Sequence, residues 1–361
     1  MSTSPKPIST ASSNPPRAGP ADGLRLTPAS LITPLLGLGL LAMALCAMLV
    51  GPYPVTPGEA VQVIARRLTG AVPAEGSTLD TVLVFVRLPR VGAAILIGAA
   101  LAAAGASYQG LFRNPLVSPD ILGVSAGAGL GAVLGIFLSL PVALIQFLAF
   151  LTGLGTVGLV LLIAASVRGR EPVLVLVLAG VVVGALAGSI VSLLKVLADP
   201  YDQLPAITFW LLGSLASIKL QDLGATLPAV ALGLAPLVLL RWRINVLSLG
   251  DEEARSLGVD AARLRIVVIA AATLITASAV SIAGVIGWVG LIMPHMARML
   301  VGPNFDRLLP AAMILGAGYL LLVDTLARTI AAIETPIGIL TAFVGAPVFL
   351  WLLARGRHGW A

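Results

Sequence analysis

The chain has 361 residues, of which 58% are hydrophobic and only 11% are charged, and its mean hydropathy is +1.04. This composition excludes a soluble globule, because most of the surface of such a protein would have to be apolar. It predicts an all-α polytopic membrane protein, since helices satisfy their own backbone hydrogen bonds in lipid.

The basic residues give the chain an isoelectric point of about 10.1. They stand singly or in pairs at the ends of apolar runs, and not in clusters with aromatic residues. The pattern therefore indicates membrane topology and not a nucleic-acid partner. The single cysteine, Cys46, lies inside an apolar run, which leaves neither a disulfide framework nor a thiolate metal cluster.

The N-terminal residues 1–29 are rich in proline and serine, a composition that cannot bury a core. We expect them to form a disordered cytoplasmic tail. The apolar run 29–50 begins too late and is too long for a typical cleaved signal, so it should remain as the first span. Residues 30–356 are then one transmembrane domain, and residues 357–361 are a cytoplasmic C-terminus.

About ten spans of about 20 residues each fit this domain. After a polar connection, apolar runs predict the second to fifth spans at 87–112, 120–140, 142–166 and 172–198. The third and fifth spans carry glycines at four-residue spacing on one helix face, which permits close helix contact. These glycines are candidates for helix packing, the simpler account, or for contact with a substrate. They are Gly123, Gly127, Gly131, Gly180, Gly184 and Gly188.

Residues 199–222 contain an apolar piece, ITFWLLGSLASI, that is too short to span a membrane and is interrupted by Gly213. We expect an interfacial or re-entrant helix there. The later apolar runs predict a sixth span at 223–240, a seventh at 266–283, an eighth that follows a glycine-rich break and ends at 294–298, a ninth at 308–327 and a tenth at 337–353.

We name residues 241–265 the elbow. It holds nine of the chain's 38 charged residues between two long apolar runs, so it is expected to face water. Asp251 is predicted to cap a helix whose first turn is acidic, and Gly258 is predicted to end that helix in a left-handed conformation. Asp260 should cap a second segment that runs to Arg265.

Ala254 precedes Leu257 and Gly258 by three to four residues, which predicts that the three share one helix face. A charged segment with this much helical signal suggests a docking surface for another protein. An ordinary solvated loop is the alternative.

The distribution of the 22 lysines and arginines supports an arrangement with both termini in the cytoplasm. Fifteen of the 22 then lie inside, including the five arginines of the elbow. Seven lie outside and need a reason, such as a partner protein: Arg66, Arg67, Arg87, Arg90, Lys195, Lys219 and Arg328.

The sequence lacks the residues that ATP hydrolysis, metal binding, nucleophilic catalysis and ion-coupled transport usually require. The sequence contains no G-x-x-x-x-G-K-[ST] phosphate loop, so the chain is not expected to hydrolyse ATP by that route. His295 and His358 lie far apart without an acidic or thiol neighbour, so neither a metal site nor a nucleophilic triad is expected. The span centres carry almost no ionisable groups of the kind that ion-coupled transporters need, so energy is expected from another protein.

Four long motifs resemble one known family. They are RLPRVGAAILIGAALAAAGASYQGLFRNPLVSPDILGVSAGAG, LGDEEARSLGV, GVIGWVGLIMPHMAR and ETPIGILTAFVGAPVFLWLL. In this order they resemble the FecCD-like permeases of bacterial ABC importers for iron-siderophores, haem and cobalamin, over residues 31–355. The resemblance implies a ten-helix subunit of the bacterial inner membrane that binds no cofactor itself. It also implies a second permease copy or paralogue, two cytoplasmic ATPases that bind ATP and magnesium, and one external substrate-binding protein.

The resemblance also implies two docking sites. In the family an L-shaped pair of helices sits in a groove of the ATPase, and the matching residues are Leu249, Gly250, Asp251, Glu252, Ala254, Arg255, Leu257 and Gly258. Outer arginines of the family receive glutamates of the binding protein, and Arg87, Arg90 and Arg328 stand at matching positions. Arg87 and Arg90 could instead be membrane-interface anchors, and Arg328 could pair with Asp324 one helical turn away.

The substrate is less determined than the family. Apolar spans rich in small residues suit a bulky metal chelate better than a bare ion. Within the family that the chain resembles, an iron-siderophore is the first expectation because such members are numerous, followed by haem and cobalamin; the family also includes oxyanion importers. Translocation would proceed by alternating access at the interface of two permeases. A stand-alone secondary transporter or channel is the alternative of another class, and a membrane scaffold is a third.

Overall fold

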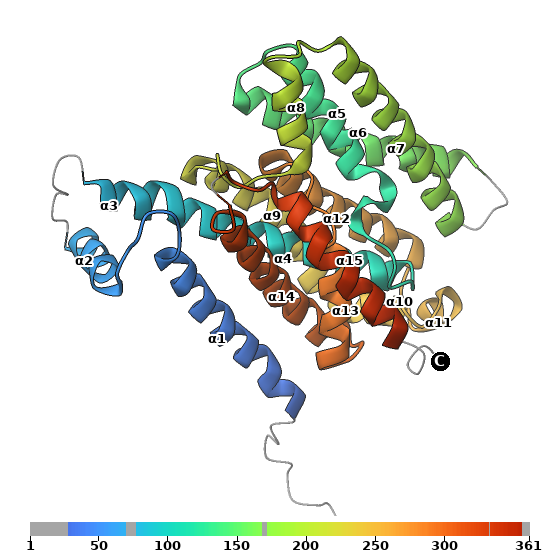
Figure 1. Cartoon of the computed structure of the whole chain (residues 1–361). Coiled ribbons are helices and arrows are strands. Elements are labelled where there is room, and N and C mark those ends of the chain that lie inside the picture. Colours follow the sequence, from blue (N-terminus) through green and yellow to red (C-terminus); the bar gives the residue numbers. More distant parts are fainter. Residues whose placement is uncertain (1–27, 70–76, 168–171, 332, 356–361) are drawn as a thin grey trace, which may run out of the picture.

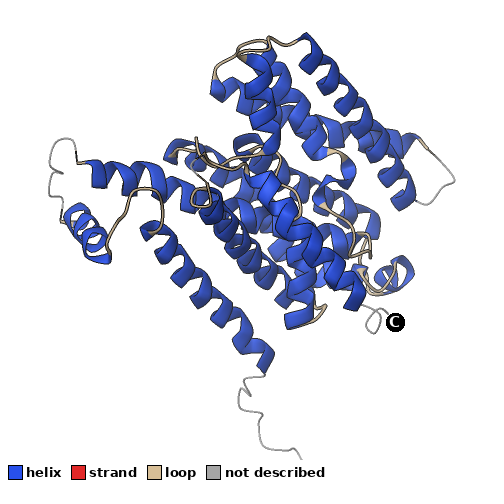
Figure 2. Cartoon of the chain, in the orientation of Figure 1, coloured by secondary structure: helices blue, strands red, loops and turns tan. Residues whose placement is uncertain are grey.

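The computed structural model describes residues 28–69, 77–167, 172–331 and 333–355, and all regular structure within these ranges is helical (Figure 2). The all-α prediction is therefore confirmed. The helices in chain order are α1 (Pro28–Leu49), α2 (Pro57–Leu68), α3 (Thr78–Asp80), the π-helix η1 (Thr81–Arg87), α4 (Leu88–Leu111), the short 3-10 helix η2 (Pro119–Leu122), α5 (Val124–Phe137), α6 (Val142–Ser166), α7 (Pro172–Leu197), α8 (Gln203–Leu212), α9 (Leu220–Leu239), α10 (Arg241–Leu247), α11 (Asp251–Ser256), α12 (Ala261–Ala283), α13 (Val289–Val301), α14 (Phe305–Ala327) and α15 (Ile337–Arg355).

Each of the ten predicted spans corresponds to a helix. Seven helical stretches of the described chain are long and apolar enough to cross a membrane by length and composition. The third span is shorter than predicted, because α5 has 14 residues, and α13, with 13, is shorter than the roughly 20 residues of a full span. Positive backbone φ angles, of 78° at Gly123 and 71° at Trp288, set the starts of these two helices, and a hydropathy pattern does not reveal them. The short helix predicted within 199–222 is confirmed as α8.

The centre of the bundle is α4, which is rich in alanine and glycine. A Cβ atom on Gly98 would lie 2.9 Å from the Cα of Ala317, and one on Gly105 would lie 2.6 Å from the carbonyl carbon of Gly290. Only glycine lets α4 approach α14 and α13 this closely. By contrast α1 lies at the edge of the bundle (Figure 1), and only 6% of its apolar stretch is buried.

The bundle has two distinct ends. The elbow helices α10 and α11 and the C-terminal end of α15 lie at one end, which we call the elbow side (Figure 1). Helices α2, α3 and α8 lie at the other, which we call the opposite side. The charged segments of the sequence are thus sorted to the two ends of the apolar helices.

Candidate functional site

The elbow folds as two short helices followed by the start of a long one. α11 begins after Gly250, whose φ is 141°, a conformation that favours glycine. Gly258 ends it with a φ of 76°, as predicted. The side chain of Asp260 caps α12 by accepting a hydrogen bond of 3.1 Å from the backbone nitrogen of Arg263, which was also predicted.

The prediction that Asp251 caps α11 is wrong, because Gly250 occupies the capping position. The Asp251 carboxylate instead accepts hydrogen bonds from the Arg265 guanidinium at 2.6 and 3.0 Å, and one from Arg113 at 3.3 Å. The hydrogen bonds from Arg265 hold the pKa of Asp251 below its ordinary value, and the charge of Arg113 acts in the same direction. One carboxylate thus ties α11 to α12 and to the turn between α4 and α5.

Two side chains of α10 tie the elbow to the start of α14. The Nε atom of Arg241 lies 2.8 Å from Oδ1 of Asp306. The Asn245 amide accepts a hydrogen bond of 2.7 Å from the backbone nitrogen of Phe305 and donates one of 3.0 Å to Asn304. Together with Asp251, these contacts join the elbow to α4, α12 and α14, three helices of the close-packed interior that can transmit a displacement.

Most of the predicted docking residues of the elbow lie at the surface. Leu249 and Leu257 are 63% and 54% exposed, although both are apolar. Glu252, Arg255 and Gly258 are exposed beside them. The group forms a mixed apolar and charged face on the elbow side, of the kind that a partner protein can cover.

Ala254 does not share this face, so the prediction that placed it beside Leu257 and Gly258 is wrong. Its side chain is fully buried and belongs to the same apolar core as Val259 and Leu264. The reason is the shortness of α11, whose last helical residue is Ser256. The three-to-four-residue spacing predicts a shared face only while the helix continues.

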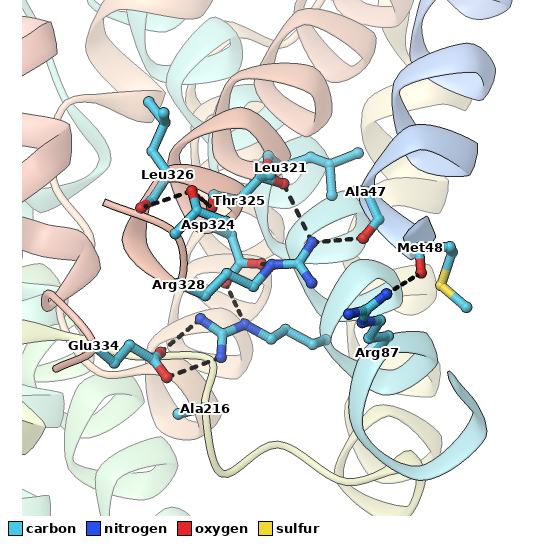
Figure 3. A network of polar contacts seen from close by, with 12 residues as sticks. Ala47, Met48, Arg87, Ala216, Leu321, Asp324, Thr325, Leu326, Arg328 and Glu334 are labelled. Carbon is cyan, nitrogen blue, oxygen red and sulfur yellow. Dashed lines mark hydrogen bonds and ion pairs between the residues drawn. The ribbon is translucent and has the colours of Figure 1, made fainter. Parts of the chain in front are cut away.

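On the opposite side, four buried charged residues and one half-buried carboxylate form a group that we name the arginine cluster (Figure 3). Arg90 lies at its centre. Its Nε donates to Asp324 at 2.7 Å, and its two terminal nitrogens donate to Glu334 at 2.6 and 3.0 Å. The members are Arg87, Arg90, Asp324, Arg328 and Glu334.

The other two arginines of the cluster hold the end of α1. Arg87 donates to the carbonyl oxygens of Met48 and Leu49 at 2.7 and 2.9 Å, and Arg328 donates to that of Ala47 at 2.7 Å. These carbonyls belong to the last turn of α1, which has no helical partner for them. The negative end of the α1 dipole adds to the attraction.

The three arginines are 3%, 6% and 8% exposed, in the order Arg87, Arg90 and Arg328. Burial of this extent does not fit anchors at a lipid interface. The alternative pairing of Arg328 with Asp324 is confirmed as a contact, with Nε and Oδ2 3.7 Å apart. A pocket of about 360 Å³ beside the cluster, lined in part by Tyr53 and Glu334, is a route by which a partner's carboxylate could approach. Docking at these arginines stays a prediction.

The glycines predicted at four-residue spacing on α5 and α7 fall into two groups, those in close packing contacts and those with free space beside them. A Cβ atom on Gly127 would lie 2.8 Å from the carbonyl oxygen of Thr152, and one on Gly131 would lie 2.6 Å from that of Leu148, so both permit packing of α5 on α6. Gly180 packs on η2, and Gly123 has the positive φ that starts α5. Gly184 has only ordinary contacts, and Gly188 has open space beside it. Contact with a substrate therefore stays a prediction for the last two alone.

Sequence reasoning missed Glu334 as a site residue. It lies in the connection before α15, at an apolar boundary where a carboxylate is costly without a partner. That boundary position could have marked Glu334 as a residue in need of a partner. It could not have identified Arg90 as that partner, because the two residues are 244 positions apart in the sequence.

A model of the FecCD transport family matches residues 39–355. The molybdate import system permease protein MolB of Haemophilus influenzae is 40% identical over 328 residues, which cover 90% of this chain and 96% of that protein. The Fe(3+)-citrate import system permease protein YfmE of Bacillus subtilis is 42% identical over 272 residues, which cover 74% and 80%. A solved metal-chelate type ABC transporter in an inward-facing conformation superposes with a TM-score of 0.81 at 39% identity, covering 90% of this chain and 99% of that one.

The chain belongs to the FecCD transport family. It is a multi-pass permease of the inner membrane and a transport component of an ABC importer.

Proposed function

We propose that this permease carries an iron chelate, of the iron-siderophore kind, into the cytoplasm. The observation that supports this cargo is the set of relatives: a permease named for Fe(3+)-citrate import at 42% identity, and a superposable transporter of the metal-chelate type. The apolar helices and their small residues also suit a bulky chelate better than a hydrated ion. Haem and cobalamin are chelates of similar size and are the next candidates.

In this proposal the permease works as one of two copies or paralogues, with the pathway between them. An ATPase subunit docks on the exposed face of the elbow, around Leu249 and Leu257. When ATP closes the two ATPases, each elbow moves, and its ties through Asp251, Arg241 and Asn245 carry the motion into α4, α12 and α14. The cargo enters from an external binding protein on the opposite side and leaves on the elbow side.

The proposal also includes docking of the binding protein at Arg87, Arg90 and Arg328, on the condition that its carboxylates can reach these arginines. The cluster holds three guanidiniums and two carboxylates, so it keeps a net positive charge that an acidic partner would complement. Because the arginines already have internal partners, a docking carboxylate would have to share or displace them. Glu334, whose side chain is 33% exposed, is the group that such a carboxylate would displace.

Molybdate is a second candidate, favoured by one observation. The molybdate permease matches over 90% of this chain and 96% of its own length, a more complete match than that of the Fe(3+)-citrate permease. An oxyanion and a chelate make different demands on the cognate binding protein, so the cargo can be assigned there as well as in the membrane.

Uptake measurements decide between these cargoes. A host strain without this gene should lose uptake of radiolabelled iron-siderophore, keep uptake of radiolabelled molybdate, and recover the first when the gene is restored. Loss of molybdate uptake with iron uptake intact would assign the oxyanion instead. The cognate binding protein should in parallel bind the ferric siderophore and not molybdate.

The orientation in the proposal has its own test. Single cysteines at Ser4 and Gly359, which lie outside the described residues, should be shielded from an impermeant thiol reagent in intact cells when Cys46 is replaced by serine. Labelling of either position from outside would reverse the assignment of the elbow side to the cytoplasm.

A further inference from the structure

A groove of about 930 Å³ runs along the elbow-side half of α6, beside the beginnings of α7 and α12. Every residue that lines it is apolar except Arg265. Its floor includes Gly155 and Gly158, and a Cβ atom on either glycine would meet nothing within 4 Å. The groove is therefore open space that the protein's own side chains do not fill.

The length of the groove matches one leaflet of a membrane. Its lining on α6 runs from Gly155 to Ala165. At 1.5 Å per residue this is roughly 15 Å, which is about half of the hydrocarbon thickness of roughly 30 Å. The rim is also apolar, since Leu162 and Ile266 are 69% and 58% exposed. One acyl chain of the elbow-side leaflet has the length and chemistry to occupy it.

Arg265 lies where the head group of such a lipid would be. Its two terminal nitrogens both donate to Asp251, but its Nε is buried and has no hydrogen-bond partner among the described residues. The second arginine on Asp251, Arg113, leaves this group of three residues with a net positive charge. A buried, charged donor without an acceptor is costly, and phosphate, like carboxylate, is an anion that a guanidinium binds with strong charge-assisted hydrogen bonds.

We propose that this groove binds an anionic phospholipid of the elbow-side leaflet, with its acyl chain along α6 and its phosphate on Arg265. The site is independent of the cargo of the permease. Because the terminal nitrogens of the same guanidinium hold Asp251, a phosphate on its Nε shares the positive charge that ties α11 to α12 and weakens that tie. The lipid is thereby linked to the position of the elbow.

The test is lipid binding by the full-length chain purified in detergent, with phosphatidylglycerol counted by native mass spectrometry. Arg265→Gln should weaken the tightest binding about tenfold, as expected for loss of one charge-assisted hydrogen bond. Arg263→Gln is the matched control, since its side chain is 88% exposed and does not line the groove. Equal binding by these two variants would overturn the proposal.

A second pair of variants separates the groove from damage to the elbow. Gly158→Leu should fill the groove and abolish the tightest binding, whereas Gly37→Leu, on a part of α1 that also has open space, should not. Asp251→Asn should strengthen binding because it frees Arg265, although it loosens the elbow as Arg265→Gln does. Weaker lipid binding in Asp251→Asn would contradict the proposal and show that Arg265 serves the position of the elbow. A change from dimer to monomer in Gly158→Leu, with lipid binding unchanged, would show that the groove binds a second copy of the chain and not a lipid.

Discussion

The elbow and the arginine cluster are the two charged regions of the molecule, and they use their charges in opposite ways. The elbow leaves most of its charges in solvent, keeps two leucines exposed and is held by a few polar ties. The arginine cluster buries three guanidiniums and joins them to carboxylates and to backbone carbonyls of the same chain. The exposed region has surface left for a partner, whereas the buried region first serves the fold.

The contrast implies that damage to the two regions differs in kind. A side chain removed from the arginine cluster leaves another charge buried without a partner, so stability should fall first. A side chain removed from the exposed face of the elbow leaves water in its place, so coupling should fall while stability is kept.

The largest expected effect is that of Arg90→Ala. It leaves Asp324, which is fully buried, and Glu334 without their main partner, and the free energy of unfolding should drop by about 3–5 kcal/mol. Thermal unfolding in detergent, followed by tryptophan fluorescence, measures the loss. The double variant Arg90→Leu with Asp324→Leu should recover part of it, because no carboxylate is left fully buried without Arg90, although Arg328 loses its contact with Asp324. An unfolding temperature unchanged in Arg90→Ala would make this arginine a docking residue and not part of the fold.

Arg87→Ala should have the next largest effect, localised at the end of α1. It removes the donor from the carbonyls of Met48 and Leu49, which should cost about 1.5–3 kcal/mol for hydrogen bonds to a charged group. Hydrogen exchange of residues 46–53 should become faster while that of α4 does not change. Arg67→Ala, an exposed arginine on α2, is the matched control. Equal exchange in the two variants would show that α1 is held by its apolar contacts alone.

The positions of the helices could be predicted from the sequence more fully than the surroundings of the charged side chains. Spans at the edge of the bundle, such as 142–166, coincide with α6 because an unbroken apolar run sets both ends of a helix that faces lipid. The elbow's Gly258 and Asp260 were also predictable, since each acts on its own backbone. Local chemistry is thus readable from local sequence.

Burial of charge and contacts between distant residues are not readable in the same way. Charge counting assigned Arg87 and Arg90 to the external side of the membrane, but it does not reveal that they are buried. They contact α1, α14 and Glu334 through pairs separated by up to 244 residues. Ala254 was placed on the same face as Leu257 by its spacing, yet α11 ends at Ser256 and Ala254 is buried in the core. Each outcome depends on tertiary packing that no single segment specifies.

A smaller effect on stability and a clear one on transport are expected for Asp251→Asn. The variant weakens the ties to Arg265 and Arg113, which are partly exposed, so we expect a loss of about 1 kcal/mol or less. Stimulation of ATP hydrolysis by the loaded binding protein should fall several-fold in reconstituted vesicles, because elbow motion is passed on less completely. Glu252→Gln, an exposed neighbour, should leave it unchanged. Wild-type stimulation in Asp251→Asn would remove this carboxylate from the coupling path.

The same carboxylate has a predictable dependence on pH. The pKa of Asp251 is lowered in the folded protein, so its contribution to stability is fully present above the ordinary carboxyl pKa of about 3.9. The contribution is lost only as the pH falls through the lowered value. The difference in unfolding temperature between wild type and Asp251→Asn should therefore be constant from about pH 5 to 8 and vanish in stronger acid. A difference that declined near neutral pH would contradict the tie to Arg265.

The smallest change in stability should come from Leu257→Ser, which alters the exposed face of the elbow without touching its ties. Leu257 is 54% exposed, so its replacement should change the free energy of unfolding by no more than about 0.5 kcal/mol. If an ATPase covers this face, the same change removes an apolar contact from the centre of an interface, where one side chain can dominate binding. Co-purification of the ATPase and transport should then fall together, while insertion and unfolding temperature stay at wild-type values. Ser256→Ala is the control beside it, because its hydroxyl bonds only to Glu253 within α11. Retained ATPase binding in Leu257→Ser would place the docking surface elsewhere on the elbow side, and a lowered unfolding temperature would show that this leucine serves the fold, as the arginine cluster does.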